Sequence, residues 1–350
     1  MLDDSEKYYK ETGKRLRTNP SSYKSDYPFL REVDSSALSN AKMNLDHAYN
    51  KFFDGKANHP RFKTKKNSRS IYATNMLHDN IRIEGSYVRL PKVKFVKAKI
   101  HRRFEGKIKK AYVTKVPSGE YYIVLLVDTV VEQLPISDRS IGIDLGVLNI
   151  ITDSNGNIVK NVKARDKYAK KLAREDRRMQ RKKEGGKNRE KQRVKLNKVY
   201  RKIVNVREDF LHKLSRKIVN ENQVIACEDL VVMEIIKHNF FAGDIYDASW
   251  TRFREMLTYK SQWYGRDLVK VARYFPSSQI CSVCGERNLS VKNTNVKKWI
   301  CKKCGTIHQR DVNASINILR EGQHLFYEDG SNWNNLRYVG ISIDVSSIET

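Results

Sequence analysis

Four of the five cysteines in this 350-residue chain form two Cys-x-x-Cys pairs. "CSVC" spans 281–284, "CKKC" spans 301–304, and 16 residues separate the pairs. Each pair directs two thiolates toward one point, and a glycine follows each pair, as a tight turn requires. This spacing is typical of a zinc ribbon, with four ligands: Cys281, Cys284, Cys301 and Cys304. Four thiolates leave no open coordination position, so we predict a structural zinc ion. Two redox dithiols would instead require a thioredoxin-like context, which the sequence lacks.

Three carboxylates in apolar surroundings form a second candidate set. Asp144 is the one charge in "SIGIDLGVLNIIT" (140–152), Glu228 ends the apolar run "VIACE", and Asp311 opens "RDVNASINILR". Taken singly, each has an ordinary structural explanation: a strand-end hydrogen-bond acceptor, a surface ion pair, or an acid favoured by a helix dipole. Asp229 is a weaker ligand candidate because its side chain faces away from that of Glu228. Asp153 lies near a turn, and we assign it a structural role.

The order of the elements that carry these carboxylates is that of an RNase H-like α/β core. Three strands, a helical segment, a parallel strand and a last helix bring the three positions together in that topology. Carboxylates that lie so close together raise each other's pKa. Two Mg²⁺ or Mn²⁺ ions bound by Asp144, Glu228 and Asp311 would offset this repulsion, one activating a water and the other stabilising the leaving oxygen of a phosphodiester. Oxygen donors suit these ions and not zinc.

The remaining patterns predict the elements around these sites. Residues 1–55 are helical, with Ser35 and Ser36 as candidate N-caps and with an apolar stripe formed by Leu38, Ala41, Leu45, Ala48 and Phe52. Residues 56–137 form an antiparallel β module with hairpins around 84–85 and 117–119. Three strands follow within 138–163, then two helices over 164–221 that are divided at Gly185-Gly186. Residues 322–350 lack a strong pattern.

A positive charge dominates the composition. The formal net charge is +28 and the pI is about 9.8, which favours a polyanionic partner. Residues 163–207 hold 20 Lys and Arg against 5 Asp and Glu. Charged helices that only face solvent usually mix both signs, and these helices lack the apolar face that a membrane surface would require, so we predict phosphate contacts. The candidates are Arg177, Arg178, Arg181, Lys182, Lys183, Lys187, Arg193, Lys198, Arg201 and Lys202.

Other features place the chain among cytosolic globular proteins. It is 39% hydrophobic and contains no run of 18 apolar residues, and its N-terminus lacks the apolar region of a secretory signal. We therefore predict a cytoplasmic location and no membrane partner. Cys227, in an apolar strand, is expected to pack in the core.

Several motifs together resemble the TnpB (OrfB-type) proteins of insertion sequences, which are related to type V CRISPR effectors. They are "PRFKTKK", "GIDLGVLNIITDSNG", "VNVREDFLHKLSRKIV", "VIACEDL", "WYGRDLVKVARYFPSSQICSVCG" and "CGTIHQRDVNASINI". The resemblance implies an RNA-guided DNA endonuclease with one RuvC-type active site, directed by a transposon-encoded guide RNA. It puts Asp144, Glu228 and Asp311 at the catalytic positions, the four cysteines at the zinc positions, and Arg310 beside the scissile phosphate. It also implies a monomer bound to RNA.

The resemblance also implies a domain organisation. Residues 1–55 would be a truncated recognition lobe, because family members begin with a wedge strand and a first helix that this chain lacks. Residues 56–137 would form the wedge, and 138–276 the RuvC-like core with a basic helical insert at 163–221. The zinc ribbon spans 277–308, the last core helix 309–321 and a tail 322–350.

Two other functions remain open at this point. A catalytically inactive, RNA-guided DNA-binding relic would be expected to lose acidic residues in the RuvC site, whereas this chain keeps all three. A transposase that joins DNA strands is compatible with an RNase H-like core. The zinc ribbon between Glu228 and Asp311 favours the nuclease.

Overall fold

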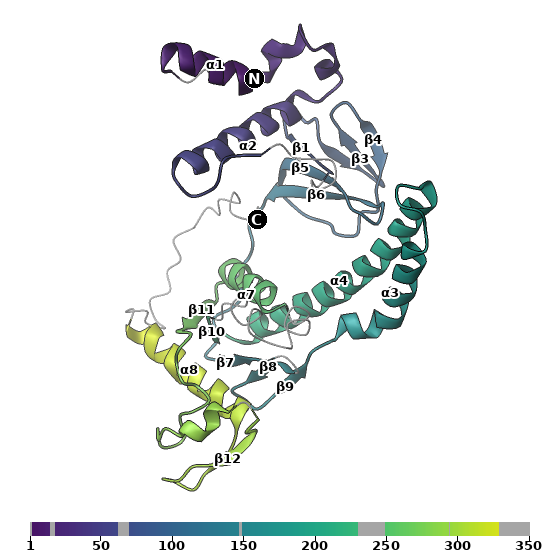
Figure 1. The fold of residues 1–350 in the computed structure, drawn as a ribbon. Coiled ribbons are helices and arrows are strands. Elements are labelled where there is room, and N and C mark those ends of the chain that lie inside the picture. Colours follow the sequence, from purple (N-terminus) through teal and green to yellow (C-terminus); the bar gives the residue numbers. More distant parts are fainter. Residues whose placement is uncertain are drawn as a thin grey trace. The chain divides into compact units, whose positions relative to one another are not determined.

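The computed structural model describes residues 2–14, 18–61, 70–146, 149–229, 249–293 and 295–328 (Figure 1). The chain divides into two compact units, 1–130 and 131–350, which are described separately. Most of the basic motif "PRFKTKK" and the end of the predicted tail, 329–350, lie outside the described residues. No described helix is long and apolar enough to cross a membrane.

The N-terminal unit begins with helices, as the sequence predicts. They are α1 (Leu2–Thr12), the 3₁₀ turns η1 (Pro20–Lys24) and η2 (Pro28–Arg31), and α2 (Ser35–Phe53). The predicted N-cap of α2 was wrong by one residue, because the Asp34 carboxylate accepts the Ser36 N–H and Ser35 is already helical. The predicted apolar stripe was also wrong in part: Ala41 is exposed, while Ser36 and Asn40 are buried. Both of these polar residues hydrogen-bond β1, which explains their burial.

Two antiparallel three-stranded sheets complete this unit and confirm both predicted hairpins. One has the order β1-β5-β6 and the other the order β2-β3-β4. Their bounds are β1 (Ser70–Asn75), β2 (Arg82–Glu84), β3 (Tyr87–Leu90), β4 (Lys94–Lys97), β5 (Lys107–Lys115) and β6 (Tyr121–Asp128). A buried cluster of Ile81, Val88, Leu90 and Ala111 joins the two sheets.

A mixed five-stranded sheet is the centre of the second unit. Its order is β11-β10-β7-β8-β9. The strands β7, β8 and β9 pair antiparallel, β10 is parallel to β7, and β11 is parallel to β10. Their bounds are β7 (Ser140–Leu145), β8 (Asn149–Asp153), β9 (Ile158–Lys160), β10 (Val224–Glu228) and β11 (Asp267–Val271).

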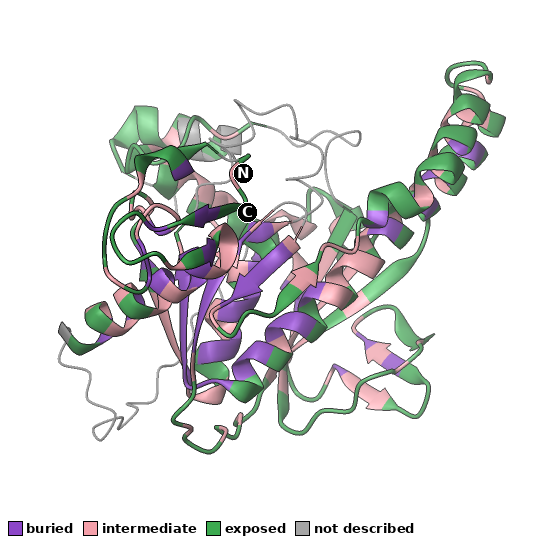
Figure 2. Cartoon of the chain, turned by 90° about the horizontal axis from the view of Figure 1, so that it is seen from below, coloured by how far each residue is buried: buried purple, intermediate pink, exposed green. Residues whose placement is uncertain are grey.

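Helices cover both faces of this sheet. The helices α4 (Lys187–Glu221) and α7 (Trp250–Tyr264) pack on one face, where Ile141, Ile143 and Cys227 belong to the main buried core. The helix α8 (Arg310–Glu328) packs on the other face, against Ala226 and Val271 through Ile318. Figure 2 shows the buried residues concentrated on the strands and on the sides of the helices that face them.

The predicted end of the last helix at 321 was wrong, because α8 continues to Glu328. Gly322 lies so close to Ala226 that a Cβ atom there would come within 3.6 Å of the Ala226 Cα. Phe326, one turn later, is also buried. These contacts with the rest of the unit stabilise a segment whose own sequence pattern is weak.

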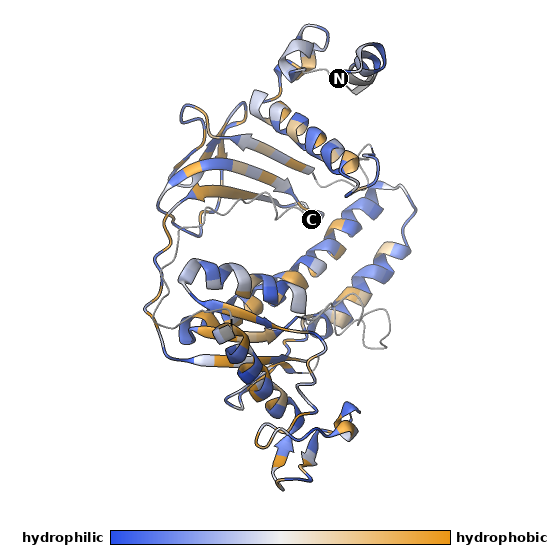
Figure 3. Ribbon diagram, turned by 90° about the vertical axis from the view of Figure 1, so that its left-hand side faces the viewer, coloured by the Kyte–Doolittle hydropathy of each residue, from blue (hydrophilic) through white to orange (hydrophobic). Residues whose placement is uncertain are grey.

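The predicted basic helices form a hairpin of α3 (Ala164–Gln180) and α4, divided at Gly185-Gly186. Ala164, Val199 and Ile203 pack between them near the sheet. Toward the turn of the hairpin most residues are exposed (Figure 2) and hydrophilic (Figure 3). The hairpin therefore has an apolar base and a charged far end.

Candidate active site and metal centres

The position of Asp144 on β7 is set by Gly142, two residues earlier. A Cβ atom on Gly142 would lie 2.6 Å from the backbone nitrogen of Leu319 on α8 and would also overlap the Ser315 carbonyl. Glycine is the residue that permits this close approach of strand and helix. Because side chains alternate along a strand, Asp144 faces the same side as Gly142, toward α8.

Asp311 reaches the same place from α8. It lies in the first turn of the helix, one turn before Ser315, which contacts Gly142. Asp144 lies two residues after Gly142 on the strand, and Asp311 lies one turn before Ser315 on the helix. The N-terminal end of α8 therefore lies beside the C-terminal part of β7.

Glu228 is level with Asp144 on the neighbouring strand. In the parallel pairing of β10 with β7, Ala226 is opposite Gly142 and Cys227 is opposite Ile143. Glu228 and Asp144 are the next residues on the two strands. Both face α8, because Ala226 and Gly142, two residues earlier on each strand, contact that helix.

The charges of Glu228 and Asp311 both act on Asp144. Burial raises its pKa well above the ordinary value, and the negative charges of Glu228 and Asp311 raise it further. The positive charges of Arg310 and Lys297 act in the opposite direction. Burial also raises the pKa of Glu228. Burial and the neighbouring negative charges thus disfavour the ionised form of Asp144, and a bound cation would favour that form.

Two cations from the ribbon side face this cluster. Arg310, the first residue of α8, was predicted to lie here, whereas Lys297 was not. The Arg310 N–H donates a hydrogen bond to the Lys297 carbonyl at 2.9 Å, so the two residues are held side by side. Lys297 is exposed and directly precedes β12 (Lys298–Ile300).

The carboxylates next to this cluster have other partners. Asp229 forms a 2.6 Å ion pair with Arg254 on α7, on the opposite face of the sheet from α8, as its predicted orientation requires. Asp153 accepts hydrogen bonds from the backbone N–H groups of Asn155 and Asn157 at 3.0 and 2.9 Å. It stabilises the turn after β8, which confirms the predicted structural role.

The three carboxylates fit a pair of hard divalent cations. All of them offer oxygen donors, which suit Mg²⁺ or Mn²⁺. Among the described residues, only the four cysteines form a group of three or more metal-ligating side chains whose ligand atoms all lie within 4.8 Å. Within the described residues, the carboxylate oxygens of Asp144, Glu228 and Asp311 do not form such a group. Their metal ligation stays a prediction.

The four cysteines form a compact cluster that fits zinc. The Sγ atoms of Cys281 and Cys304 are 3.6 Å apart, and those of Cys284 and Cys301 are 3.5 Å apart. Zinc–sulfur bonds of about 2.3 Å in a tetrahedron would require sulfur–sulfur distances of about 3.8 Å. Two hydrogen bonds from Thr306, through its hydroxyl and its backbone N–H, lower the pKa of Cys304 to about 6, which favours the thiolate form.

Local backbone geometry brings these cysteines together. The N–H of Gly285 donates to the Cys281 carbonyl, and the N–H of Gly305 donates to the Cys301 carbonyl, both at 2.9 Å. Both glycines have positive φ, 77° and 70°, a conformation that other residues rarely adopt. The ribbon also contains η3 (Leu289–Lys292) and pairs β12 with β13 (Ile307–Gln309).

A buried histidine supports the cysteine cluster. The Nε2 atom of His308 lies 3.0 Å from the Cys281 Sγ, and its ring stacks on Trp299 with centroids 4.6 Å apart. Burial lowers the pKa of His308, so the ring is neutral at pH 7. A neutral imidazole with its proton on Nε2 donates a hydrogen bond to the sulfur and stabilises a thiolate.

The far end of the α3–α4 hairpin contains a buried acid among arginines. The Glu175 carboxylate accepts hydrogen bonds from Gln192 at 2.8 Å, Arg178 at 3.1 Å and Arg174 at 3.3 Å. The bond from Gln192 lowers the pKa of Glu175 most, and both arginines lower it further. Here a polar network replaces the apolar packing near the sheet, and it holds the two helices together.

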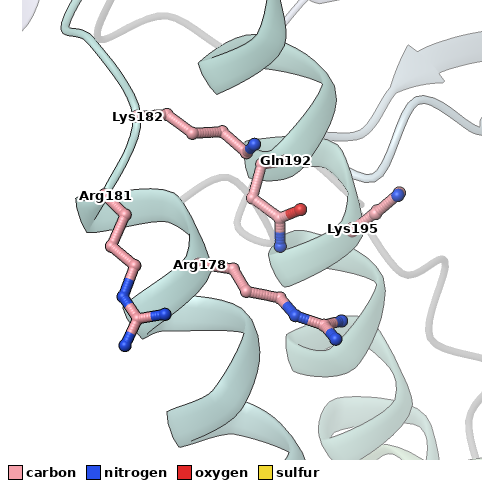
Figure 4. Close-up of a pocket in the computed structure, with 5 residues that line it drawn as sticks. All are labelled: Arg178, Arg181, Lys182, Gln192 and Lys195. Atoms are coloured by element: carbon pink, nitrogen blue, oxygen red, sulfur yellow. The ribbon is translucent and has the colours of Figure 1, made fainter.

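A basic pocket lies at this end of the hairpin (Figure 4). Its volume is about 340 Å³. The lining residues come from α3, the turn and α4: Arg178, Arg181, Lys182, Gln192 and Lys195. Four of the five are cationic, and no acidic side chain lines the pocket. Such a pocket offers several donors to one phosphate group.

The predicted nucleic-acid contacts all lie on the hairpin, and most are exposed. Arg193 forms an ion pair with Glu190 at 2.6 Å, and both side chains are more than half exposed. Exposed pairs contribute about 0–1 kcal/mol, so this pair is weak enough for Arg193 to exchange partners. Arg201 is half-buried. Lys195, which lines the pocket, was not among the predicted contacts.

Comparison with known proteins assigns the family. Residues 122–238 match the OrfB_IS605 family model, described as "Probable transposase", and residues 250–318 match the "Cas12f1-like, TNB domain". A Streptomyces pristinaespiralis protein named "Putative RNA-guided DNA endonuclease" is 36% identical over 84% of this chain and 73% of its own length. The chain belongs to the TnpB/OrfB family. The Escherichia coli relative "Putative RNA-guided DNA endonuclease InsQ" is 30% identical over 84% of this chain and 76% of its own length.

A solved structure shares the fold of this TnpB-family protein. It is described as "Cryo-EM structure of the Cas12f1-sgRNA-target DNA complex". The TM-score is 0.53 at 17% sequence identity, covering 90% of this chain and 79% of the other. The mixed α/β fold is therefore similar to that of Cas12f1.

Sequence reasoning missed three side chains beside the two sites of this TnpB-family protein. They are Ser277, Lys297 and His308. Ser277 and His308 are buried polar residues that meet partners far away in the chain, and Lys297 follows a segment without a regular pattern. Ser277 and His308 do lie within the motifs that resemble the family, in "FPSSQICSVCG" and "CGTIHQRD". That position is the one signal that could have drawn attention to them.

Proposed function

We propose that this protein is an RNA-guided DNA endonuclease of the TnpB family, which hydrolyses phosphodiester bonds at one site formed by Asp144, Glu228 and Asp311. The observation that carries the proposal is geometric: the strand register sets Glu228 level with Asp144, and the packing of α8 on both strands brings Asp311 to the same place. Burial and the charges of the other two carboxylates also raise the pKa of Asp144. Titratable groups perturbed in this way are typical of functional sites. The names of the two relatives support the activity.

The sheet around this site supports an RNase H-like, RuvC-type core. Numbered within the core, the strands have the order 3-2-1-4-5, with the first three antiparallel and the last two parallel to the first. Asp144 lies on the first strand, Glu228 at the C-terminal end of the fourth and Asp311 on the following helix. The α3–α4 hairpin is then an insertion between the third and fourth strands.

The residues of the chain have separate tasks in the proposed reaction. Asp144, Glu228 and Asp311 would bind two Mg²⁺ or Mn²⁺ ions, which supply the activation of water and the stabilisation of the leaving oxygen. Arg310 and Lys297 bring positive charge to the carboxylates, and this charge would attract a phosphate. The four cysteines would hold a structural zinc ion, because they leave no position for a substrate.

The α3–α4 hairpin would bind the nucleic-acid backbone. Its pocket presents Arg181, Lys182 and Lys195, together with Arg178, which is paired with Glu175 at 3.1 Å. Phosphate contacts of this kind give affinity without sequence specificity. A transposon-encoded guide RNA would supply the specificity by base pairing with target DNA, while the protein recognises a short flanking motif. The helical segment 1–55 and the β module 56–137 would be the recognition and wedge regions.

Co-expression with the neighbouring genomic sequence tests this function. We expect one RNA species to co-purify, and we expect the complex to cut a matching DNA when Mg²⁺ is present. Asp144→Ala should abolish cutting and leave DNA affinity within about twofold, because the residue lies outside the basic surface. DNA bound but never cut by the wild type would indicate an inactive relic. Joined DNA strands formed without RNA would indicate a transposase.

A further inference from the structure

A buried serine outside the carboxylate cluster contacts Glu228. The Ser277 hydroxyl donates a hydrogen bond to the Glu228 Oε1 atom at 2.8 Å. Ser277 is only 6% exposed and lies in the turn between β11 and the first zinc ligand, Cys281. The bond joins groups 49 residues apart in the chain.

The backbone of Ser277 is fixed from both sides. Its carbonyl accepts a hydrogen bond from the Asn317 side chain on α8 at 2.7 Å, and its N–H donates to the Phe275 carbonyl at 2.8 Å. Asn317 is 4% exposed and also donates to the Ile280 carbonyl at 2.7 Å. Asn313, one turn earlier on α8, donates to the same carbonyl at 2.7 Å. These hydrogen bonds therefore fix the backbone position from which the Ser277 hydroxyl extends.

We propose that Ser277 is a positioning residue that orients the Glu228 carboxylate for divalent metal binding. A carboxylate without a hydrogen-bond partner rotates about its last side-chain bond. A donor in a fixed position that hydrogen-bonds one of its oxygens restricts this rotation. The hydrogen bond uses one lone pair of Oε1 and leaves the lone pairs of Oε2 for a metal ion. Groups that hydrogen-bond a metal ligand typically change metal affinity 10- to 100-fold when they are removed.

The role of Ser277 rests on the proposed function, because it presumes that Glu228 binds metal. It goes beyond that function because it assigns a task to a residue outside the three carboxylates. Ser277, which hydrogen-bonds Glu228, lies four residues before Cys281, in a turn that is hydrogen-bonded to the helix that carries Asp311. One helix, α8, thus supplies one carboxylate and fixes the orientation of another.

Direct Mn²⁺ binding tests the proposal. The full-length protein with its co-purified RNA is compared as wild type, Ser277→Ala, Ser277→Thr and Ser278→Ala, with free Mn²⁺ measured by electron paramagnetic resonance. We expect Ser277→Ala to weaken Mn²⁺ binding 10- to 100-fold. Ser277→Thr keeps the hydroxyl and should stay within about threefold of wild type. The control, Ser278→Ala, should match wild type, because within the described residues the Ser278 side chain makes no hydrogen bond.

Cleavage gives a second readout. For Ser277→Ala, the Mn²⁺ concentration for half-maximal cutting should rise by the same factor, while the rate at saturating Mn²⁺ recovers. Equal Mn²⁺ affinity in Ser277→Ala and Ser278→Ala, or a rate that stays low at saturating Mn²⁺, would overturn the proposal. If Ser277→Ala does not fold, Ser277→Cys replaces the hydroxyl with a slightly larger thiol that is a weaker donor, and wild-type affinity in that variant overturns the proposal equally.

A reference variant separates this proposal from the proposed function. If Asp144→Asn loses Mn²⁺ binding and the Ser277 variants do not, only the role of Ser277 fails. If Asp144→Asn binds Mn²⁺ as the wild type does, the metal centre itself fails, and the role of Ser277 fails with it.

Discussion

The two clusters of metal-ligating groups in this protein are assembled in opposite ways. The cysteines lie within 24 residues, 281–304, and two glycine-ended turns and a short hairpin bring them together. The carboxylates span residues 144–311 and meet only because two neighbouring strands and a helix are correctly packed. One site is therefore specified by local sequence and the other by the topology of the whole unit.

The clusters also differ in how the protein balances their charge. The Nε2 atom of His308 lies 3.0 Å from the Cys281 sulfur, and hydrogen bonds from Thr306 lower the pKa of Cys304, which favours its thiolate form. Around Asp144, burial raises the pKa most, the charges of Glu228 and Asp311 raise it further, and the charges of Arg310 and Lys297 lower it. Four thiolates leave no coordination position for a substrate and suit a structural ion. Three carboxylates suit divalent ions that take part in chemistry.

The largest effect is expected when a zinc ligand is removed. Cys281→Ser with Cys284→Ser leaves two sulfur ligands, and zinc binding typically contributes about 10–16 kcal/mol to the folding of such modules. The variant should lose zinc, measured by atomic absorption, and limited proteolysis should cut within 277–308. The five-stranded sheet, tested by protease-resistant fragments, should persist. A ribbon that stays resistant without zinc would contradict the difference between the two clusters.

A smaller effect, with a defined pH dependence, is expected at Asp144. Its raised pKa means that the folded protein binds this proton more tightly than the unfolded chain. The free energy of unfolding of the metal-free protein therefore decreases as the pH rises from the ordinary carboxyl pKa, 3.8, through the raised value. Asp144→Asn removes this ionisation. At pH 8 the metal-free variant should melt a few degrees above wild type, since 1 kcal/mol corresponds to about 2–4 °C in a domain of this size.

Added Mn²⁺ should reverse that order of melting temperatures. It should stabilise the wild type by binding the folded state, and it should leave Asp144→Asn nearly unchanged. Differential scanning calorimetry at pH 5 to 8, with and without Mn²⁺, measures both effects. A variant that melts below wild type without metal at every pH would show that the carboxylates do not repel one another.

These two sites also show how far the sequence alone could predict the structure. Cysteine spacing predicted a local site, and the order of strands and helices placed Asp144, Glu228 and Asp311 on the elements that meet. The extension of α8 to Glu328 was missed, because Gly322 is stabilised there by packing on Ala226. The N-cap Asp34 was missed because it precedes two serines that cap equally well on sequence grounds.

The smallest effect is expected from the basic hairpin. Arg181→Gln with Lys182→Gln removes two cations from the pocket in Figure 4. The slope of log affinity for DNA against log salt should fall by about 1 to 2, because each phosphate contact contributes about 0.7–0.9. Lys213→Gln with Lys217→Gln, exposed positions on α4 nearer the sheet, is the matched control and should change the slope less. Equal slopes in both double variants would show that the pocket does not bind phosphate.

The central claim is that Asp144, Glu228 and Asp311 hold divalent metal ions while the cysteines hold zinc. Anomalous X-ray scattering from crystals soaked in MnCl₂, collected at the manganese and zinc absorption edges, tests both halves at once. The account predicts two manganese peaks among the three carboxylates and one zinc peak among the four sulfurs. Manganese peaks absent from the carboxylates at saturating MnCl₂, or zinc found there in place of the cysteines, would contradict it.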